Sequence, residues 1–232
     1  MAEISWSVAD EVSEGLEYGV LIPLEVRRVA DGGFTVSCYP QVEPQVRAIL
    51  EKAEDPLAAD TLQALVEAVR PFAADYATEP LPYTDDRYEL YALESPPMPM
   101  LTAEGELRPL TADDFDELVN YTDFEPDFDG RMLGLVLDGA ICAVAAENPY
   151  APEGTAEIHV VTAADYRGRG FATACVSGLV RMLFADGITY ITYCCEKSNV
   201  ASVHVAEKVG FTRTAEFYPV LCDLEDESVE GE

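Results

Sequence analysis

The chain is poor in positive charge and in histidine. Its 232 residues include 44 Asp and Glu but only 14 Lys and Arg, which gives a formal net charge of -30, and the two histidines are His159 and His204. Phosphate backbones are repelled by such a surface, so the composition argues against nucleic acid as a partner. The simplest explanation is an acidic surface that maintains solubility, and a cationic substrate would also suit it.

Several familiar sequence signals are missing. No apolar run approaches the roughly 18 residues that span a membrane. The acidic N-terminus lacks the basic start and apolar stretch of a signal peptide. We therefore expect a cytoplasmic protein without a membrane partner. No Cys-x-x-Cys pair occurs, so we expect no metal site. The cysteines are expected to be small buried side chains: Cys38, Cys142, Cys175, Cys194, Cys195 and Cys222.

A proline-rich segment at residues 94–106 separates two regions of different pattern. Three prolines within four positions disfavour both helix and central strand there. We predict a small α+β unit over residues 1–98, a second unit over 99–222, and a disordered acidic tail over 223–232. The first unit carries no chemical motif that indicates its role.

Local patterns predict the elements of the first unit. These are a hairpin, two amphipathic helices and one more strand, at residues 18–40, 42–53, 55–72 and 86–95. Asp31 and Gly32 supply the hairpin turn. Asp55, which precedes Pro56, is expected to cap the second helix.

The second unit has a longer alternation of strands and helices. Strands are predicted at 106–110, 155–163, 188–195 and 212–222, a hairpin at 132–147 that turns at Asp138-Gly139, and helices at 111–121, 171–187 and 199–211. The expected fold class is α/β (α+β), with a mixed, mostly antiparallel sheet flanked by helices.

The stretch "DYRGRGFATA" at 165–174 places a glycine turn between a strand and a helix. Free backbone N–H groups and the helix dipole make such a place suitable for phosphate. Gly168 and Gly170 allow a ligand to approach the backbone closely, and Arg167 and Arg169 add charged donors. A tight turn with two solvated arginines is an equally good interpretation. The Walker and dinucleotide-binding glycine motifs are both absent.

The context of this turn resembles a known family. "AEIHVVTAADYRGRGFATA" resembles the acetyl-coenzyme A signature of the GNAT (Gcn5-related) N-acetyltransferases, Arg/Gln-x-x-Gly-x-Gly/Ala, here filled by Arg167, Gly170 and Ala172. "NVASVHVAEKVGF" at 199–211 resembles the second signature of the same family. The resemblance covers roughly residues 100–222. It is nearest to a branch with an extra N-terminal region that includes antibiotic self-resistance acetyltransferases.

The resemblance implies an acyltransferase that uses acetyl-CoA as co-substrate and no metal. Its acceptor would be a primary amine of a small molecule, acetylated directly in a ternary complex, and a homodimer is compatible with it. Two alternatives are a catalytically silent acyl-CoA-binding or sensing module and an acetyltransferase of protein lysines or N-termini. The implied coenzyme-binding residues are Val160, Val161, Thr162, Arg167, Gly168, Arg169, Gly170, Phe171, Ala172, Thr173, Asn199 and Ser202.

Direct transfer also requires a base for the acceptor amine. A free alkylamine titrates near pH ~10, so its proton must be removed at neutral pH. Glu157 is the first candidate and His159, on the same side of the predicted strand, is the second. A plain surface carboxylate is an equally good interpretation of Glu157. The family's oxyanion donor, a backbone N–H, would fall at Val161 or Thr162.

The group that protonates the leaving thiolate has no clear place in this sequence. Many members of the family carry a tyrosine just before Glu-Lys in the second signature, where this chain has Ala206. Tyr193, Cys195 and Ser202 are the candidate substitutes. Asn199 is also expected to cap the helix that follows it.

Overall fold

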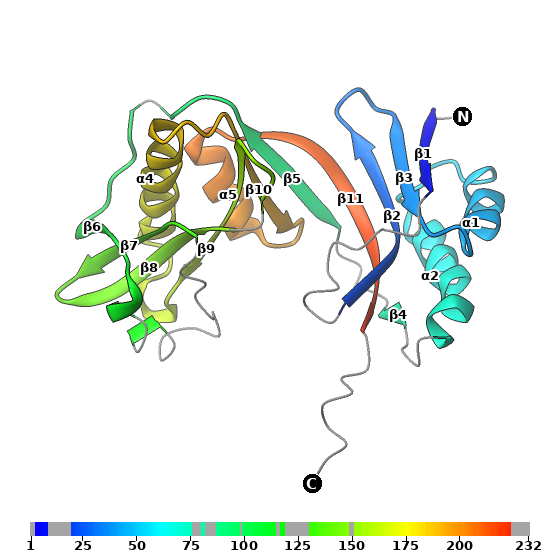
Figure 1. The fold of residues 1–232 in the computed structure, drawn as a ribbon, viewed down its shortest axis with the longest axis horizontal. Helices are drawn as coiled ribbons and strands as arrows, with labels where there is room; N and C mark the ends of the chain where they lie inside the picture. Colours follow the sequence, from blue (N-terminus) through cyan, green and yellow to red (C-terminus); the bar gives the residue numbers. More distant parts are fainter. Residues whose placement is uncertain are drawn as a thin grey trace, which may run out of the picture. The chain divides into compact units, whose positions relative to one another are not determined.

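A computed structural model describes residues 3–8, 20–75, 80–81, 87–97, 99–114, 117–118, 130–148 and 151–223 of the chain. It contains two compact units, residues 1–89 with 214–232, and residues 90–213 (Figure 1). The chain passes from one unit to the other twice, within strand β5 (Tyr88–Leu93) and near the start of strand β11 (Thr212–Asp223). The acidic tail predicted after residue 222 lies outside the described residues from 224 onward.

The first unit is a sheet with two helices. Its strands follow the order β1 (Ile4–Val8), β3 (Phe34–Cys38), β2 (Val20–Val29), β11, and the short β4 (Pro80–Leu81) also pairs with β11. The hairpin of β2 and β3 is confirmed, and Gly32 at its turn has a φ of 87°. Strand β1, which the sequence pattern did not predict, runs parallel to β3 with Ile4 opposite Phe34.

Helices α1 (Glu43–Leu50) and α2 (Ala59–Ala74) pack on this sheet through one apolar cluster that includes Val36, Val46 and Leu65. The expectation that Asp55 caps the second helix is wrong, because the helix begins four residues later and its N-cap is Ala58. Asp55 instead closes the preceding turn: its carboxylate accepts a hydrogen bond from the Leu57 N–H at 3.0 Å and pairs with Arg28 at 2.7 Å.

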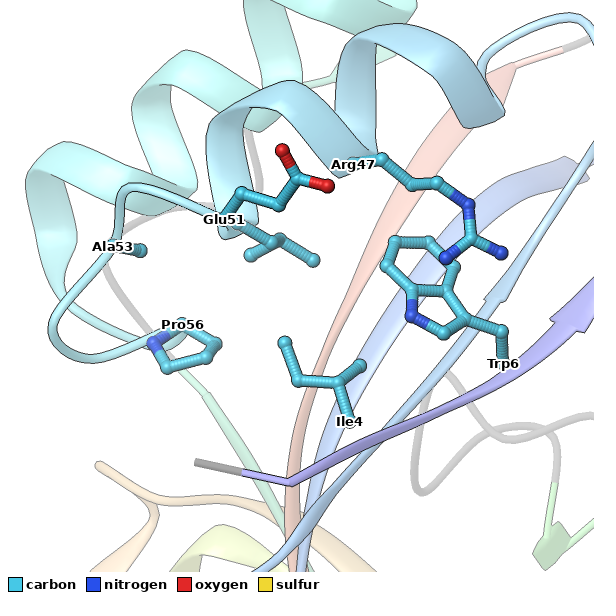
Figure 2. A pocket seen from close by; sticks show the side chains of 7 residues that line it. Ile4, Trp6, Arg47, Glu51, Ala53 and Pro56 are labelled. Atoms are coloured by element: carbon cyan, nitrogen blue, oxygen red, sulfur yellow. The ribbon is translucent and has the colours of Figure 1, made fainter. Parts of the chain in front are cut away.

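The first unit also contains a small hollow between β1 and α1 (Figure 2), with a volume of about 220 Å³. Arg47 and Trp6 both line this hollow, and the Arg47 guanidinium lies 3.9 Å from the ring centroid of Trp6. Its Nε donates to Glu43 at 2.7 Å, so a cation–π contact and an ion pair fix this arginine. The remaining lining residues are Ile4, Leu50, Glu51, Ala53 and Pro56.

The second unit is built on the strand order β5, β10 (Tyr190–Glu196), β9 (Thr155–Thr162), β8 (Ala140–Glu147), β7 (Met132–Leu137), β6 (Glu106–Pro109). From β6 to β9 neighbouring strands are antiparallel, whereas β9 and β10 are parallel. The hairpin of β7 and β8 turns at Asp138 and Gly139, whose φ values are 52° and 88°. The predicted fold class, a mixed and mostly antiparallel sheet with helices, is therefore confirmed.

Helix α4 (Phe171–Ala185) packs on the sheet with Cys175, Leu179 and Leu183 fully buried. Helix α5 (Val200–Val209) starts at Asn199, whose side chain accepts a hydrogen bond from the Ser202 N–H at 3.1 Å. It ends at Gly210, which has a φ of 106°. Both the cap at Asn199 and the end at Gly210 are confirmed predictions.

The cysteines are free thiols, and all except Cys194 are buried. Cys194 is half-buried while its neighbour Cys195 is buried, since successive residues of β10 face opposite sides of the sheet. Most of the cysteines therefore act as small core side chains, as the sequence predicted.

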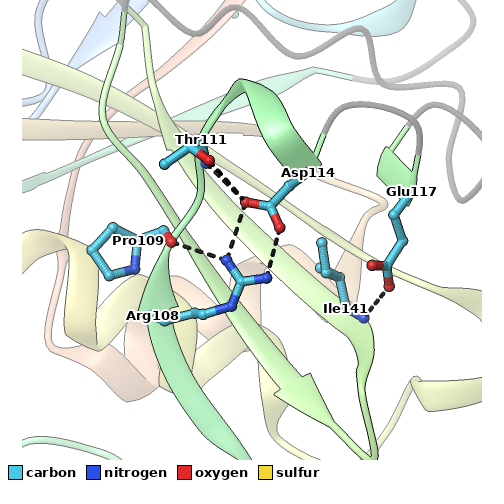
Figure 3. Close-up of polar contacts among 6 residues, drawn as sticks. All are labelled: Arg108, Pro109, Thr111, Asp114, Glu117 and Ile141. Carbon is cyan, nitrogen blue, oxygen red and sulfur yellow. Dashed lines mark hydrogen bonds and ion pairs between the residues drawn. The ribbon is translucent and has the colours of Figure 1, made fainter.

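The predicted helix over 111–121 is only partly within the described residues. It opens with a 3₁₀ turn, Ala112–Asp114 (Figure 3). Asp114 accepts two hydrogen bonds from Arg108, at 2.6 and 3.1 Å, and a third from the Thr111 N–H at 2.9 Å. Glu117 accepts from the Ile141 N–H of β8 at 2.6 Å. These bonds fix the start of the segment to the strands below it.

Candidate active site

Strands β9 and β10 separate part-way along their length. Their register runs from Tyr190 opposite Thr155 to Tyr193 opposite Ile158. Both strands then continue, β9 to Thr162 and β10 to Glu196, but their register ends at this pair. On its β10 side, β9 therefore has a free edge over residues 160–162, about 10 Å long at the usual ~3.3 Å per residue.

The hydrogen bonds to β8 show which backbone groups face that free edge. The Glu157 carbonyl accepts from the Asn148 N–H at 2.8 Å, and the Ala163 N–H donates to the Cys142 carbonyl at 3.1 Å. The β8–β9 register between these two bonds is unbroken. The backbone N–H and C=O groups of successive residues point to opposite sides of a strand. Those of Val161 therefore point toward β8, whereas those of Val160 and Thr162 point toward the free edge. Of the two positions predicted for an oxyanion donor, this geometry favours Thr162.

The glycine turn lies directly after this edge. Gly168 and Gly170 have φ values of 75° and 82°, and a Cβ built on either would meet no atom within 4 Å. Gly170 is also the N-cap of α4, so the first N–H groups of that helix open onto the same space. The Arg167 Nε donates to the Thr162 carbonyl at 3.2 Å and ties the turn to the end of β9.

One groove of about 940 Å³ joins the free edge, the turn and helix α5. Eleven of the twelve residues predicted to bind the coenzyme line it, and Arg169 is the exception. The groove also contains six residues outside that predicted set. Most of these follow helical spacing along α5, so the periodicity of the second signature could have indicated them. They are Tyr166, Ala201, His204, Val205, Glu207 and Lys208.

The side chain of Arg169 has other partners. Its guanidinium lies 4.7 Å from the ring centroid of Phe171 and 5.6 Å from that of Tyr166. It also pairs with Glu104 at 3.5 Å. The cationic side chains that line the groove are instead Arg167 and Lys208.

Two of the four catalytic candidates, Glu157 and His159, lie on β9 outside the lining of the groove. Their neighbours Ala156 and Ile158 belong to the core under α4, so Glu157 and His159 face the other side of the sheet. Glu157 accepts a hydrogen bond from the Asn148 amide at 3.2 Å. Desolvation by the surrounding protein lowers the pKa of His159, although its side chain is exposed, and favours neutral imidazole at pH 7.

The other two candidates, Tyr193 and Ser202, lie together. Tyr193 is only 2% exposed, and its hydroxyl is hydrogen-bonded to Ser202, which lines the groove. Burial raises the pKa of Tyr193, so its hydroxyl keeps its proton at neutral pH. Cys195 and Ala206 are buried and do not line the groove.

Within the described part of the chain, no group of three or more His, Cys, Asp or Glu side chains is arranged to hold a metal ion. None of the described helices is long and apolar enough to cross a membrane.

A model of the acetyltransferase (GNAT) family matches residues 87–211, more than half of the chain. The chain belongs to the GNAT family. The matched region contains the free edge of β9, the glycine turn and α5, so the groove lies within the GNAT domain. The resemblance of the two signatures to this family is thereby confirmed.

Several solved structures are similar to this chain. A putative GNAT acetyltransferase from Novosphingobium aromaticivorans is 23% identical, with a TM-score of 0.51 over 61% of this chain and 66% of that one. A GNAT acetyltransferase from Colwellia psychrerythraea is 14% identical, with a TM-score of 0.48 over 60% and 56%. A GCN5-related N-acetyltransferase from Kribbella flavida is 21% identical, with a TM-score of 0.48 over 75% and 78%. This chain thus covers less than two thirds of the length of the first two structures. No protein with a curated description matches it.

Proposed function

We propose that this GNAT chain transfers the acetyl group of acetyl-CoA directly to a primary amine of a small molecule. The observation that carries this proposal is the free edge of β9, which opens beside the glycine turn in one groove. An extended arm with amide groups, such as pantetheine, can pair with the backbone of Val160 and with the N–H of Thr162, whose carbonyl already accepts from Arg167. Family membership makes acetyl-CoA the expected co-substrate.

The residues present fit that co-substrate. The open space over Gly168 and Gly170 admits a pyrophosphate against the first N–H groups of α4. Arg167 and Lys208 supply positive charge in a chain whose net charge is -30. A backbone N–H directed to the free edge would stabilise the oxygen of the tetrahedral intermediate, and Val160 and Thr162 carry the N–H groups that face it.

Glu157 is our candidate for the base that deprotonates the acceptor amine. It lies on the same strand as Thr162, but its side chain faces the sheet side opposite α4. A base there can act on the amine if the acceptor approaches from that side, directly or through one water molecule. His159, two residues along and kept neutral by desolvation, is the second candidate.

One observation favours the alternative of a catalytically silent acyl-CoA-binding module. The place that the family signature gives to a tyrosine is occupied by Ala206, which is fully buried and carries no proton to donate. A chain with an intact groove and no means of stabilising the thiolate would bind acetyl-CoA without using it.

Measuring acetyl-CoA binding by calorimetry, beside CoA release with a panel of primary amines and with water, tests the proposal. We expect micromolar-range binding, on the order of typical substrate affinities, and turnover with at least one amine. Glu157→Gln should lower kcat at neutral pH, while Glu153→Gln, a nearby exposed control, should not. Binding without any turnover would support the silent module. Acetyl-lysine formed on a protein, with no reaction of small amines, would support the protein-directed enzyme.

A further inference from the structure

Strand β1 lies at the border of the first unit's sheet, and its sequence lacks the usual protection of such an edge. Among the described strands it pairs with β3 alone. Its residues, ISWSV, include no charge and no proline. Strand β6, at the border of the second unit's sheet, has Glu106, Arg108 and Pro109 within four residues. Proteins place charge and proline on exposed edges to prevent pairing, so β6 is protected whereas β1 is open to another strand.

The hydrogen bonds to β3 show which backbone groups of β1 face outward. The Phe34 N–H donates to the Glu3 carbonyl at 2.9 Å, and the register between the two strands is unbroken along the whole of β1. Since successive residues direct their backbone groups to opposite sides of a strand, the odd-numbered residues of β1 face β3. The residues whose N–H and C=O groups face the outer edge are Ile4, Trp6 and Val8.

This outward set is symmetrical about Trp6, and so is the sequence around it. In an antiparallel pair of two β1 strands centred on Trp6, the two tryptophans lie opposite each other. Ile4 of one copy then lies opposite Val8 of the other, and Ser5 lies opposite Ser7. Every outward N–H meets an outward carbonyl in this register. The strand is therefore complementary to itself, as a two-fold symmetric interface requires.

The side chains of β1 also suit a second copy. Ile4 and Trp6 point toward α1 (Figure 2) and pack against the core of the first unit, whereas Val8 is 37% exposed. The pairing brings Val8 against Ile4 of the other copy. Arg47, whose guanidinium lies over Trp6, is neutralised by Glu43 at 2.7 Å. Two chains with a net charge of -30 repel each other, so an uncharged strand is a favourable place for them to meet.

We propose that β1 pairs with β1 of a second copy of this chain, antiparallel and centred on Trp6, so that the first unit serves for dimerisation. The inference does not depend on the proposed acetyl transfer. Two five-residue strands form a smaller contact than a standard interface of ~1,600 Å². We therefore expect a weak dimer, with a Kd on the order of 10–100 μM. Added salt should tighten it, because screening reduces the repulsion between two acidic chains.

Ser5 and Ser7 allow a test that is specific for this register, because both are exposed and lie opposite each other in the pair. Sedimentation equilibrium of the full chain at about 10 to 500 μM should show wild type passing from monomer to dimer. Ser5→Glu/Ser7→Glu and Ser5→Lys/Ser7→Lys should each weaken the dimer about tenfold or more, since like charges directly opposite are destabilising. An equimolar mixture of the two should form a heterodimer at least as tight as the wild-type dimer.

Matched controls carry the same charges outside β1. Gln41 and Gln63 are exposed residues of the first unit. Gln41→Glu/Gln63→Glu and Gln41→Lys/Gln63→Lys should dimerise like wild type. Trp6 fluorescence should show the same urea midpoint in all the variants as in wild type, measured on the monomer at low concentration, because the β1–β3 pairing is retained.

The outcomes decide the proposal without reference to activity. A wild-type chain that stays monomeric at about 500 μM overturns it. A dimer that weakens between roughly 0.1 and 1 M salt, where the Debye length falls from ~10 to ~3 Å, also overturns it. Double serine variants that dimerise like wild type place the interface elsewhere, and variants that stay monomeric when mixed refute the register about Trp6. Because the readout is mass, a chain without turnover would refute the proposed function and leave this test unaffected.

Discussion

Tyr193 of β10 lies opposite Ile158 of β9, and the register of the two parallel strands ends at this pair. The pair marks the point at which a continuous part of the sheet becomes a groove. On one side of this pair the sheet is continuous, and the Ile158 and Tyr193 side chains belong to the buried core under α4. On the other side the backbone of β9 is directed toward the groove and the glycine turn.

Gly170→Glu should abolish acetyl-CoA binding. The open space over Gly170 would be filled by a side chain whose charge repels pyrophosphate. Gly139→Glu, in the turn between β7 and β8, is the matched control because Gly139 also has a positive φ of 88° and open space around it. Both variants should lose about 1–2 kcal/mol of stability from the left-handed backbone. Calorimetry should find binding in the Gly139 variant only, and retained affinity in Gly170→Glu would refute the assignment of the turn.

Arg167 and Arg169 should contribute unequally to binding. Arg167 lines the groove, whereas the Arg169 guanidinium is occupied by Glu104 and the Phe171 ring. We expect Arg167→Ala to weaken acetyl-CoA binding about tenfold, the worth of one charge-assisted hydrogen bond. Arg169→Ala should change the Kd less than about twofold, since its backbone amide is retained. Equal losses in the two variants would show that Arg169 turns toward the ligand.

Asp114→Asn should destabilise the second unit at neutral pH by about 2 kcal/mol, because Asp114 accepts two charge-assisted hydrogen bonds from Arg108 (Figure 3). The Arg108 side chain holds the pKa of Asp114 below its usual range. The stabilisation is therefore complete above the unfolded-state pKa near ~3.9 and is lost as pH falls through the lower folded-state pKa. Urea unfolding at pH 7 and pH 3 should show the difference from wild type shrinking at the lower pH. Asp113→Asn, at an exposed neighbour, should show no such difference at either pH.

Trp6 should report on the first unit alone, since it is the single tryptophan of the chain and lies on β1. Replacing Arg47 by Met removes the cation over its ring and should cost about 1 kcal/mol (Figure 2). Urea unfolding followed by Trp6 fluorescence should show a lower midpoint in Arg47→Met. Affinity for acetyl-CoA should stay the same, because the groove belongs to the other unit. Arg70→Met, which removes an exposed cation of α2, is the control and should leave the midpoint unchanged.

The elements that sequence reasoning predicted well are those fixed by neighbouring residues. The turn at Asp138-Gly139 and the cap at Asn199 each follow from the chemistry of two or three adjacent positions. Strand β1 was missed because its largely exposed residues gain their order from pairing with β3, about thirty residues away. The start of α2 was misplaced because Asp55 binds Arg28, a distant partner that no local pattern reveals.

The groove also combines features that adjacent residues determine with features that depend on residues far apart in the sequence. Its two signatures are local, so the glycine turn and Asn199 could be found in the sequence. The separation of β9 from β10 depends on where the strand register stops, and the contact of Tyr193 with Ser202 depends on tertiary packing. The partner of Arg169 is Glu104, 65 positions earlier, so the direction of that arginine could not be read from its own motif.

The free edge of β9 has a consequence for the state of the protein before it meets a ligand. Unpaired strand edges usually invite other chains, and proteins commonly protect them at the border of a sheet with charge or proline. Here the unpaired backbone lies inside the sheet, between β8 on one side and the diverging β10 on the other. A strand of another chain could therefore pair with this edge only by entering the groove between β9 and β10. Such a gap is less open to other chains than an outer edge of a sheet is, and we expect it to favour thin ligands with amide groups.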